Sequence, residues 1–68
     1  MLNMIDWFAH VRIKETGITG IVVDIHTVKG TERFEVESDE KGTPGGFGDD
    51  DSWKLYGCVE SELEVIEE

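Results

Sequence analysis

The sequence predicts an all-β fold of five short strands, with a single turn of 3₁₀ helix before the last strand. Three observations support this prediction. Apolar and polar residues alternate with period two, β-branched residues are dense in the first half of the chain, and glycine recurs at short intervals between the alternating segments. A chain of 68 residues is long enough for one domain with a thin core. We therefore expect residues 1–68 to form one small β domain.

The first strand is expected within residues 9–14, where Val11 and Ile13 fall on the same face of an alternating segment. Residues 1–8 precede it as an N-terminal extension, in which the apolar spacing is partly helical. Residues 15–17 follow it as a turn that contains a glycine. This region therefore predicts a half-buried strand that leads into a tight connection.

Residues 18–28 form the strongest predicted strand, because β-branched residues dominate it. Gly20 permits a bend in this strand, and Val22 is expected to pack in a second small cluster at that bend. The core-facing residues of the strand are expected to be Ile21, Val23 and Ile25.

A hairpin turn is expected at Lys29 and Gly30, since glycine readily adopts positive φ. Residues 31–38 then alternate cleanly, which places Phe34 and Val36 inward. The two long strands on either side of this turn are therefore expected to form a hairpin.

Residues 39–51 are rich in glycine and acidic residues and offer little apolar surface to bury. Ordering such a segment costs conformational entropy without a compensating gain, so we expect a flexible acidic loop. Phe47 is the exception, because it is a lone aromatic residue within this stretch.

Residues 52–59 resume the alternation, with Leu55 and Cys58 on opposite faces. Leu55 is expected in the core, and Cys58 is expected to be a small buried apolar residue. Residues 60–63 predict the 3₁₀ turn, and residues 63–66 predict the last strand. The whole predicted core consists of Val11, Ile13, Ile21, Val23, Ile25, Phe34, Val36, Leu55, Leu63 and Val65.

Two segments of this pattern carry a family resemblance. The first hairpin combines Val11-Arg12-Ile13-Lys14 with Gly17-Ile18-Thr19-Gly20-Ile21-Val22-Val23-Asp24, which is similar to the opening of KOW domains, and the chain closes with Glu62-Leu63-Glu64-Val65-Ile66. Over residues 9–66 the chain therefore resembles the SH3-like small barrels, including KOW and Tudor-type domains, and it is similar to small acidic proteins of bacteriophages and other mobile elements. The resemblance implies a five-stranded SH3-like barrel and no particular activity. Unlike the KOW domains that bind RNA, this chain lacks a basic surface.

Acidic residues outnumber basic residues by sixteen to six, which gives a net charge of −10. Residues 1–31 hold three of each sign, so the excess lies in residues 32–68, with thirteen acidic and three basic residues. Such a chain repels nucleic-acid phosphates and anionic membranes, so neither is expected as a partner. The uneven distribution leaves two interpretations open, a face for a basic partner or a solvated surface that favours solubility.

Other functions are disfavoured by features that the sequence lacks. No apolar run approaches the roughly 18 residues that span a bilayer. The N-terminus lacks the basic and apolar regions of a signal peptide, so a cytoplasmic protein is expected. Cys58 is the only cysteine, which excludes an internal disulfide and a multi-thiolate metal site.

Catalysis is not expected, because neither histidine lies in a recognisable catalytic pattern. His10 and His26 occupy outward strand positions, with no nucleophile motif or glycine-rich phosphate loop around them. The acidic run at 49–51, with Asp39 and Glu40, offers oxygen ligands for Ca²⁺ or Mg²⁺, but it lacks the alternating ligands and the final Glu of an EF-hand loop. We therefore expect no enzyme, no cofactor and no dedicated metal site.

Aromatic residues beside acidic ones predict a surface for a Lys- or Arg-rich partner, through cation–π contacts and charge pairing. The structural alternative is that Trp53 closes one end of a thin barrel. A functional alternative is an inhibitor that mimics nucleic acid and blocks the basic groove of a DNA- or RNA-binding protein. We thus predict a non-enzymatic protein-interaction module with a strongly acidic face that binds a basic protein partner. The candidate partner-binding residues are Phe47, Asp49, Asp50, Asp51, Trp53, Tyr56, Glu35 and Glu37.

Overall fold

A computed structural model describes residues 5–66 of the chain, and its elements confirm the predicted fold class. Over these residues the structure is all-β, with five strands in one antiparallel sheet and a single 3₁₀ turn before the last strand. Within the described range, no helix is long and apolar enough to cross a membrane. Residues 1–4 of the predicted N-terminal extension lie outside this range. The elements are β1 (His10–Ile13), β2 (Thr19–Val28), β3 (Thr31–Lys41), β4 (Trp53–Val59), η1 (Glu60–Glu62) and β5 (Leu63–Val65).

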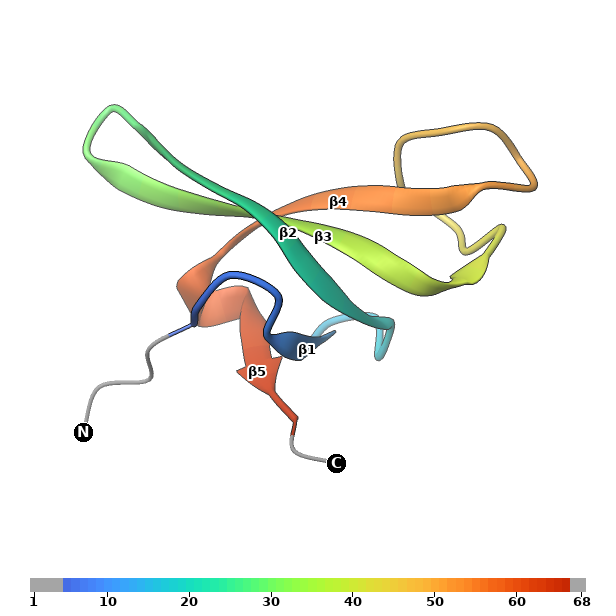
Figure 1. Cartoon of the computed structure of the whole chain (residues 1–68), viewed down its shortest axis with the longest axis horizontal. Coiled ribbons are helices and arrows are strands. Elements are labelled where there is room, and N and C mark those ends of the chain that lie inside the picture. The colour runs from blue at the N-terminus through green and yellow to red at the C-terminus, as the bar shows by residue number, and fades with distance from the viewer. Residues whose placement is uncertain (1–4, 67–68) are drawn as a thin grey trace.

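The strands follow the order β4-β3-β2-β1-β5, so the first strand lies between the second and the last. Val11 on β1 pairs with Gly20 on β2 and with Val65 on β5. Figure 1 shows β2 and β3 as a long twisted ribbon, with β1 and β5 beneath it. The return of the last strand to the first is what a small barrel-like fold requires.

The hairpin between β2 and β3 turns at Lys29 and Gly30, as predicted. Both residues have positive φ, at 52° and 83° respectively. Two successive residues with positive φ form a turn whose twist matches that of the flanking strands. Val28 pairs directly with Thr31, which closes the two-residue loop.

β2 contains a β-bulge close to the position of the predicted bend. Val22 pairs with Val36, but Asp24 pairs with Glu35, so Val23 is an extra residue without a direct partner. Positions before and after a bulge differ by one in phase. The strand therefore faces the core with even-numbered residues before the bulge and with odd-numbered residues after it.

This change of phase makes part of the predicted core wrong. Val22 is completely buried and belongs to the main core, not to a second cluster. Ile21 and Val23 are only half-buried and lie outside the core. Ile25, which follows the bulge, packs against the core as predicted.

β4 also differs from the prediction in its facing. Tyr56 pairs with Val36 and packs against the core, and Cys58 is buried as predicted. Leu55 lies on the opposite face and is only half-buried, so its place in the predicted core is wrong. Lys54 takes a third inward position and is 8% exposed. A lysine at an inward position makes the inward face look polar in the sequence, so the alternation assigns the wrong face to the core. Such a lysine can be buried because its apolar stem packs inside while its amino group reaches a partner.

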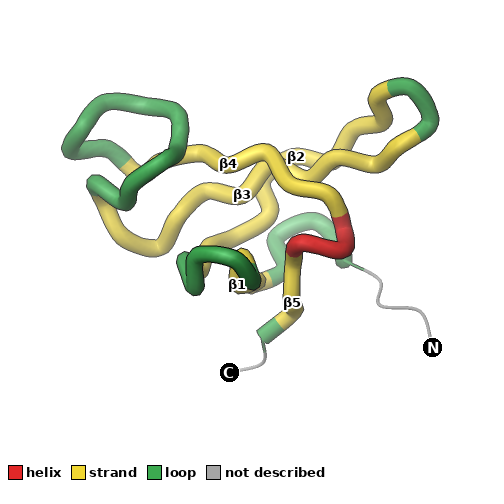
Figure 2. The backbone as a smooth tube through the Cα atoms, turned by 180° about the vertical axis from the view of Figure 1, so that it is seen from behind, coloured by secondary structure: helices red, strands yellow, loops and turns green. Residues whose placement is uncertain are grey.

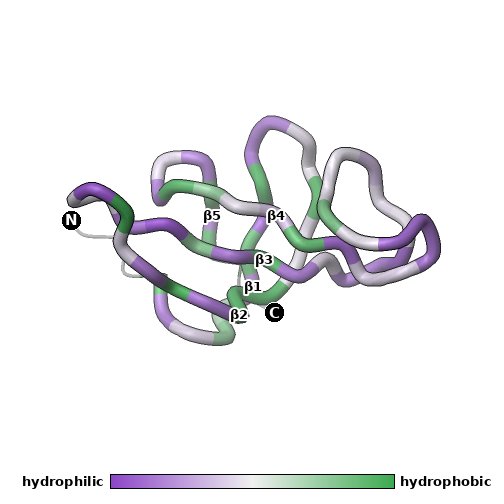
Figure 3. Tube along the Cα trace, turned by 90° about the horizontal axis from the view of Figure 1, so that it is seen from above, coloured by the Kyte–Doolittle hydropathy of each residue, from purple (hydrophilic) through white to green (hydrophobic). Residues whose placement is uncertain are grey.

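The core draws on every strand and on the segment before β1. Ile5 is buried there, although the partly helical spacing of its segment did not predict it. Val65 is 44% exposed, so its predicted core position is wrong. Only Leu63, the first residue of β5, is buried in the core. Figure 2 shows the single turn η1 leading from β4 into β5, and Figure 3 shows hydrophobic and hydrophilic residues alternating along the strands. The core consists of Ile5, Val11, Ile13, Val22, Phe34, Val36, Cys58 and Leu63.

β3 is longer than predicted. It continues to Lys41, so residues 39–41 belong to the sheet and the segment between β3 and β4 spans residues 42–52. We call residues 42–52 the acidic loop. A second irregularity in pairing, between Glu37 and Lys41, accommodates the extra residues at this end of the strand.

We call the sheet face opposite the core the outer face. Residues that pair directly across neighbouring strands share a face, so the inward positions of Val22, Val36 and Tyr56 place their strand neighbours outward. The outer face includes His10, Arg12, Thr19, Ile21, Asp24, Glu35, Glu37, Asp39, Trp53, Leu55 and Gly57.

Candidate functional site

Phe47 is 80% exposed, the highest value among the large apolar side chains of the described residues. The acidic loop doubles back along the edge of β4, where Phe47 and Leu55 form an isolated antiparallel bridge. The Phe47 N–H donates to the Leu55 carbonyl at 2.8 Å, and the Leu55 N–H donates to the Phe47 carbonyl at 3.0 Å. Phe47 therefore stands on hydrogen-bonded backbone although its ring is open to solvent.

Inward residues of β4 hold the acidic loop against the sheet. Lys54 Nζ donates to the Gly48 carbonyl at 3.1 Å. The Tyr56 hydroxyl lies 2.7 Å from the Thr43 hydroxyl and 2.7 Å from the Pro44 carbonyl oxygen. Tyr56, a predicted partner-binding residue, therefore lies beneath the loop on the inner side of β4 and away from the outer face.

The loop also packs closely where Gly46 crosses these two residues. A Cβ at Gly46 would lie 2.6 Å from Lys54 Cβ and 2.8 Å from the Tyr56 ring, so only glycine fits there. The loop therefore packs closely against β4 at this point, although it offers little apolar surface to bury. Its flexibility, which was predicted for residues 39–51, stays a prediction.

Trp53 lies on the outer face at the start of β4 and is 52% exposed. Lys41, its cross-strand partner, places Nζ 4.4 Å from the centroid of the indole ring. This separation is that of a cation–π contact. The interpretation of Trp53 as a plug at one end of the barrel is wrong, because the ring is outside the core and accessible.

Two of the predicted acidic residues, Glu35 and Glu37, lie on the outer face of β3. Glu37 pairs with Leu55, the residue that Phe47 bridges, and Glu35 pairs with Gly57. Neither carboxylate forms an ion pair with another described residue. The surface between β3 and β4 thus combines two exposed aromatic rings with two uncompensated carboxylates.

The three aspartates at 49–51 lie in the acidic loop and are exposed. The Asp49 carbonyl accepts hydrogen bonds from the Ser52 N–H at 3.0 Å and from the Ser52 hydroxyl at 2.8 Å, so this segment is a turn. Within residues 5–66, no three His, Cys, Asp or Glu side chains are arranged to hold a metal ion. The aspartates therefore contribute negative charge in the same loop that presents Phe47.

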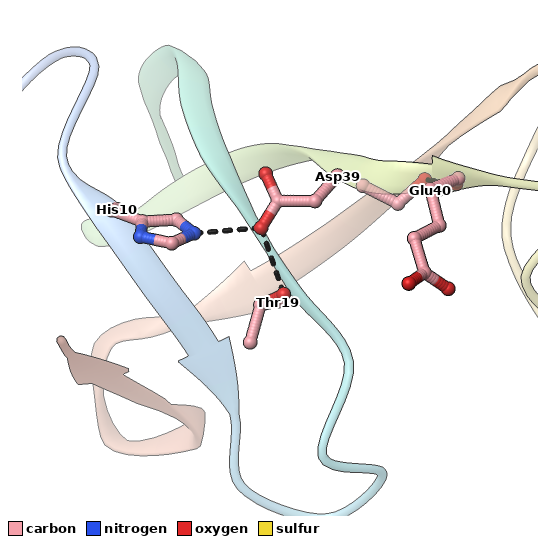
Figure 4. Close-up of polar contacts among 5 residues, drawn as sticks. His10, Thr19, Asp39 and Glu40 are labelled. Carbon is pink, nitrogen blue, oxygen red and sulfur yellow. Dashed lines mark hydrogen bonds and ion pairs between the residues drawn. The ribbon is translucent and has the colours of Figure 1, made fainter. Parts of the chain in front are cut away.

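A polar cluster on the outer face joins the first three strands. His10 Nε2 lies 2.6 Å from Asp39 Oδ2, and the Thr19 hydroxyl donates to the same oxygen at 2.8 Å (Figure 4). The hydrogen bond with His10 lowers the pKa of Asp39 below its usual value of 3.8. Burial opposes this shift, while the bond from Thr19 and the attraction of His10 add to it.

This cluster does not have the geometry of a catalytic triad. In a triad the nucleophilic hydroxyl contacts the imidazole, which a carboxylate orients from the other side. Here the Thr19 hydroxyl contacts the Asp39 carboxylate, and the second ring nitrogen of His10, Nδ1, is buried. The arrangement instead ties β1 and β2 to the end of β3.

Sequence reasoning placed His10 on an outward position but did not find its partner. Asp39 is 29 residues away along the chain and was predicted to lie in a loop. Residues 38–41 are all polar, so no alternation of apolar and polar residues marked the continuation of β3 past Ser38. Ser38 is 3% exposed and its hydroxyl accepts a hydrogen bond from the Lys54 N–H at 3.0 Å, so a buried polar residue extends the strand.

Cys58 is the one thiol of the chain and faces the core. Burial raises the pKa of this thiol, and the negative charge of Glu62 raises it further against a smaller opposing effect of Arg33. A thiol with a raised pKa stays protonated near neutral pH and is a poor nucleophile. Cys58 therefore acts as a packing residue.

Comparison of the chain with protein-family models, curated proteins and solved structures gives no match. The resemblance to KOW and Tudor-type domains accordingly stays a prediction.

Proposed function

We propose that the chain is a non-enzymatic protein-interaction module, and that the outer face between β3 and β4 binds a basic segment of a partner protein. One observation supports this proposal above the others. Phe47 and Trp53 present exposed rings on a hydrogen-bonded sheet edge, beside the carboxylates of Glu35 and Glu37.

An exposed aromatic ring on ordered backbone is well suited to anchor a partner. Little conformational entropy is lost when such a ring is covered, and its burial removes apolar surface from water. The neighbouring carboxylates attract lysine and arginine, whose side chains also stack favourably on aromatic rings. The contact of Lys41 with Trp53, at 4.4 Å, shows this kind of pairing within the chain itself.

No particular observation favours the alternative, a mimic of nucleic acid. A mimic needs its carboxylates in a regular row on one surface. The acidic residues of the described chain lie on several elements, including β3, the acidic loop and η1, and Arg12, Arg33 and Lys41 interrupt them. We therefore keep the interaction module as the proposed function.

The proposal is tested by isothermal titration calorimetry with a short peptide of alternating lysine and valine residues. The same peptide with glutamate in place of lysine is the control ligand. We expect the lysine peptide alone to bind, and binding to weaken as salt rises. The Phe47→Ala variant should lose about 1–3 kcal/mol of binding free energy.

The matched control is Trp7→Ala, because Trp7 is another exposed aromatic residue, 50% exposed, outside the site. This variant should bind as the natural chain does. Equal binding of both peptides, or equal effects of the two substitutions, would contradict the proposal. Competition by added DNA, combined with cumulative losses from many acid-to-amide changes, would favour the mimic instead.

A further inference from the structure

The edge of β4 has a short stretch of open backbone at Gly57. The Leu55 N–H and carbonyl both point away from β3, because both are bonded to Phe47. In an antiparallel strand the direction of these groups alternates, so those of Gly57 also point to the free edge. Two residues further, the Val59 N–H is capped by Glu62 Oε1 at 2.8 Å.

Gly57 therefore lies between two edge positions that are already occupied. Within residues 5–66, no group hydrogen-bonds to the Gly57 N–H or carbonyl on this side. Unpaired edge groups are a template for an additional strand. The bridge at Phe47 shows that a segment of chain fits along this same edge.

Gly57 also leaves a gap in the outer face. It is exposed, and a Cβ built on it would meet nothing within 4 Å. Its cross-strand partner is Glu35, so the side chain of Glu35 is reachable from the edge of the sheet across the missing side chain. At Glu37 the corresponding route is filled by Leu55 and Phe47.

The negative charge around Glu35 favours the binding of a cation beside it. On its other side Glu35 pairs with Asp24 of β2, and like charges directly opposite each other repel. His26 Nδ1 lies 3.4 Å from Asp24, but no described cation is paired with Glu35. A positive side chain placed over Gly57 would relieve this repulsion.

We propose that an extended segment of the partner pairs with the edge of β4 at Gly57 in a short antiparallel β-bridge, next to the bridge at Phe47, with a lysine or arginine directly opposite Gly57. The cationic side chain crosses the gap and pairs with Glu35. Neighbouring strands lie about 4.8 Å apart, so this residue is two such spacings from β3 and only a long side chain spans the distance. The inference rests on the proposed function and specifies how its basic partner binds.

A second copy of this chain is a poorer occupant of the edge. Pairing of two β4 strands about Gly57 would place a glycine opposite Gly57 and supply no cation. It would also bring together two chains that each carry a net charge of −10. Charge complementarity therefore selects a basic segment.

The first test uses the full chain, labelled with ¹⁵N, and the lysine–valine peptide described above. On addition of the peptide, we expect the Gly57 amide resonance to shift and its hydrogen exchange to slow, while Gly30 at the distant hairpin turn stays unchanged. A peptide with alternate backbone nitrogens methylated keeps its charge but cannot pair with the edge. It should bind at least tenfold more weakly, since both edge hydrogen bonds are lost.

The second test compares matched variants. Glu35→Gln and Glu32→Gln remove the same charge from the same strand, and Glu32 is exposed near the hairpin turn, outside the proposed site. The two variants therefore lower the net negative charge equally. We expect Glu35→Gln to weaken binding roughly tenfold and Glu32→Gln to have less than about a twofold effect. Gly57→Val should also weaken binding about tenfold because its side chain fills the gap, whereas Thr27→Val, which places an exposed valine on a strand away from the gap, should not.

The outcomes separate this inference from the proposed function. Binding that depends on Phe47 but leaves the Gly57 amide unshifted, and that Gly57→Val does not weaken, overturns the pairing at Gly57 alone. Failure of the peptide to bind overturns both. Protection of the Gly57 amide without peptide, rising with protein concentration, would identify a second copy as the occupant and overturn the inference. If Gly57→Val does not fold, the methylated peptide and the glutamate pair decide the question.

Discussion

His10 on β1 and Asp39 on β3 meet across β2, with 2.6 Å between Nε2 and Oδ2. The Thr19 hydroxyl of the intervening strand donates to the same carboxylate oxygen. Three strands are thus joined on the outer face by one carboxylate, and these contacts lower the pKa of Asp39. The cluster holds β3 in the sheet beyond the end that the sequence predicted.

The lowered pKa of Asp39 predicts how stability depends on pH. Because its pKa is lower in the folded chain than in the unfolded chain, ionised Asp39 stabilises the fold above its usual pKa of 3.8. This contribution is lost as the pH falls through the lower, folded-state pKa. Asp39→Asn should therefore cost less than about 1 kcal/mol at neutral pH, since the pair is partly exposed. Chemical denaturation of both chains across the acid range measures the difference, which should shrink below pH 3.8. A difference that persists unchanged in acid would show that ionisation of Asp39 is not its source.

We expect the truncation of Phe34 to alanine to cause the largest loss of stability of any single truncation. It is 2% exposed in the core, so Phe34→Ala should cost about 3–5 kcal/mol. A domain of this size has a free energy of unfolding of roughly 5 kcal/mol, so the variant should be close to unfolded. The matched variant is Phe47→Ala, which removes the same ring from a position that is 80% exposed and should change stability by less than about 0.5 kcal/mol. Urea denaturation of the two variants checks this, and similar midpoints would show that the assignment of the core face of β3 is wrong.

At Gly20, β2 and β3 lie so close together that no side chain fits between them. A Cβ at this position would lie 2.3 Å from the Glu37 carbonyl oxygen, which is backbone and cannot turn aside. Gly20→Ala should therefore destabilise the fold by about 1–3 kcal/mol or more. Gly57→Ala is the control, because nothing lies within 4 Å of its Cβ position, and it should be neutral or slightly stabilising. Thermal denaturation of both variants would contradict this account if Gly20→Ala melted as the natural chain does.

The positions of the strands follow from the sequence by itself. Alternation and β-branched residues predicted segments that agree with β1, β2 and β4 to within one residue at each end. The Lys29-Gly30 turn was also predictable, because a two-residue hairpin needs positive φ and glycine adopts it readily. These are local properties of the backbone and its neighbouring side chains, so a short stretch of sequence carries them.

The facing of those strands was decided by the tertiary structure. Alternation with period two tells which residues share a face, but not which of the two faces turns inward. The bulge at Val23 also changes which residues face the core within one strand. Inward facing of Lys54 depends on the Gly48 carbonyl, which the folded loop brings to its amino group. The place of Phe47 on the edge of β4, and the meeting of His10 with Asp39, likewise arise from contacts between distant parts of the chain. Local sequence thus determines where the strands of this protein lie. Its core and its candidate binding face form only when the strands pair, because the register of pairing brings those residues together.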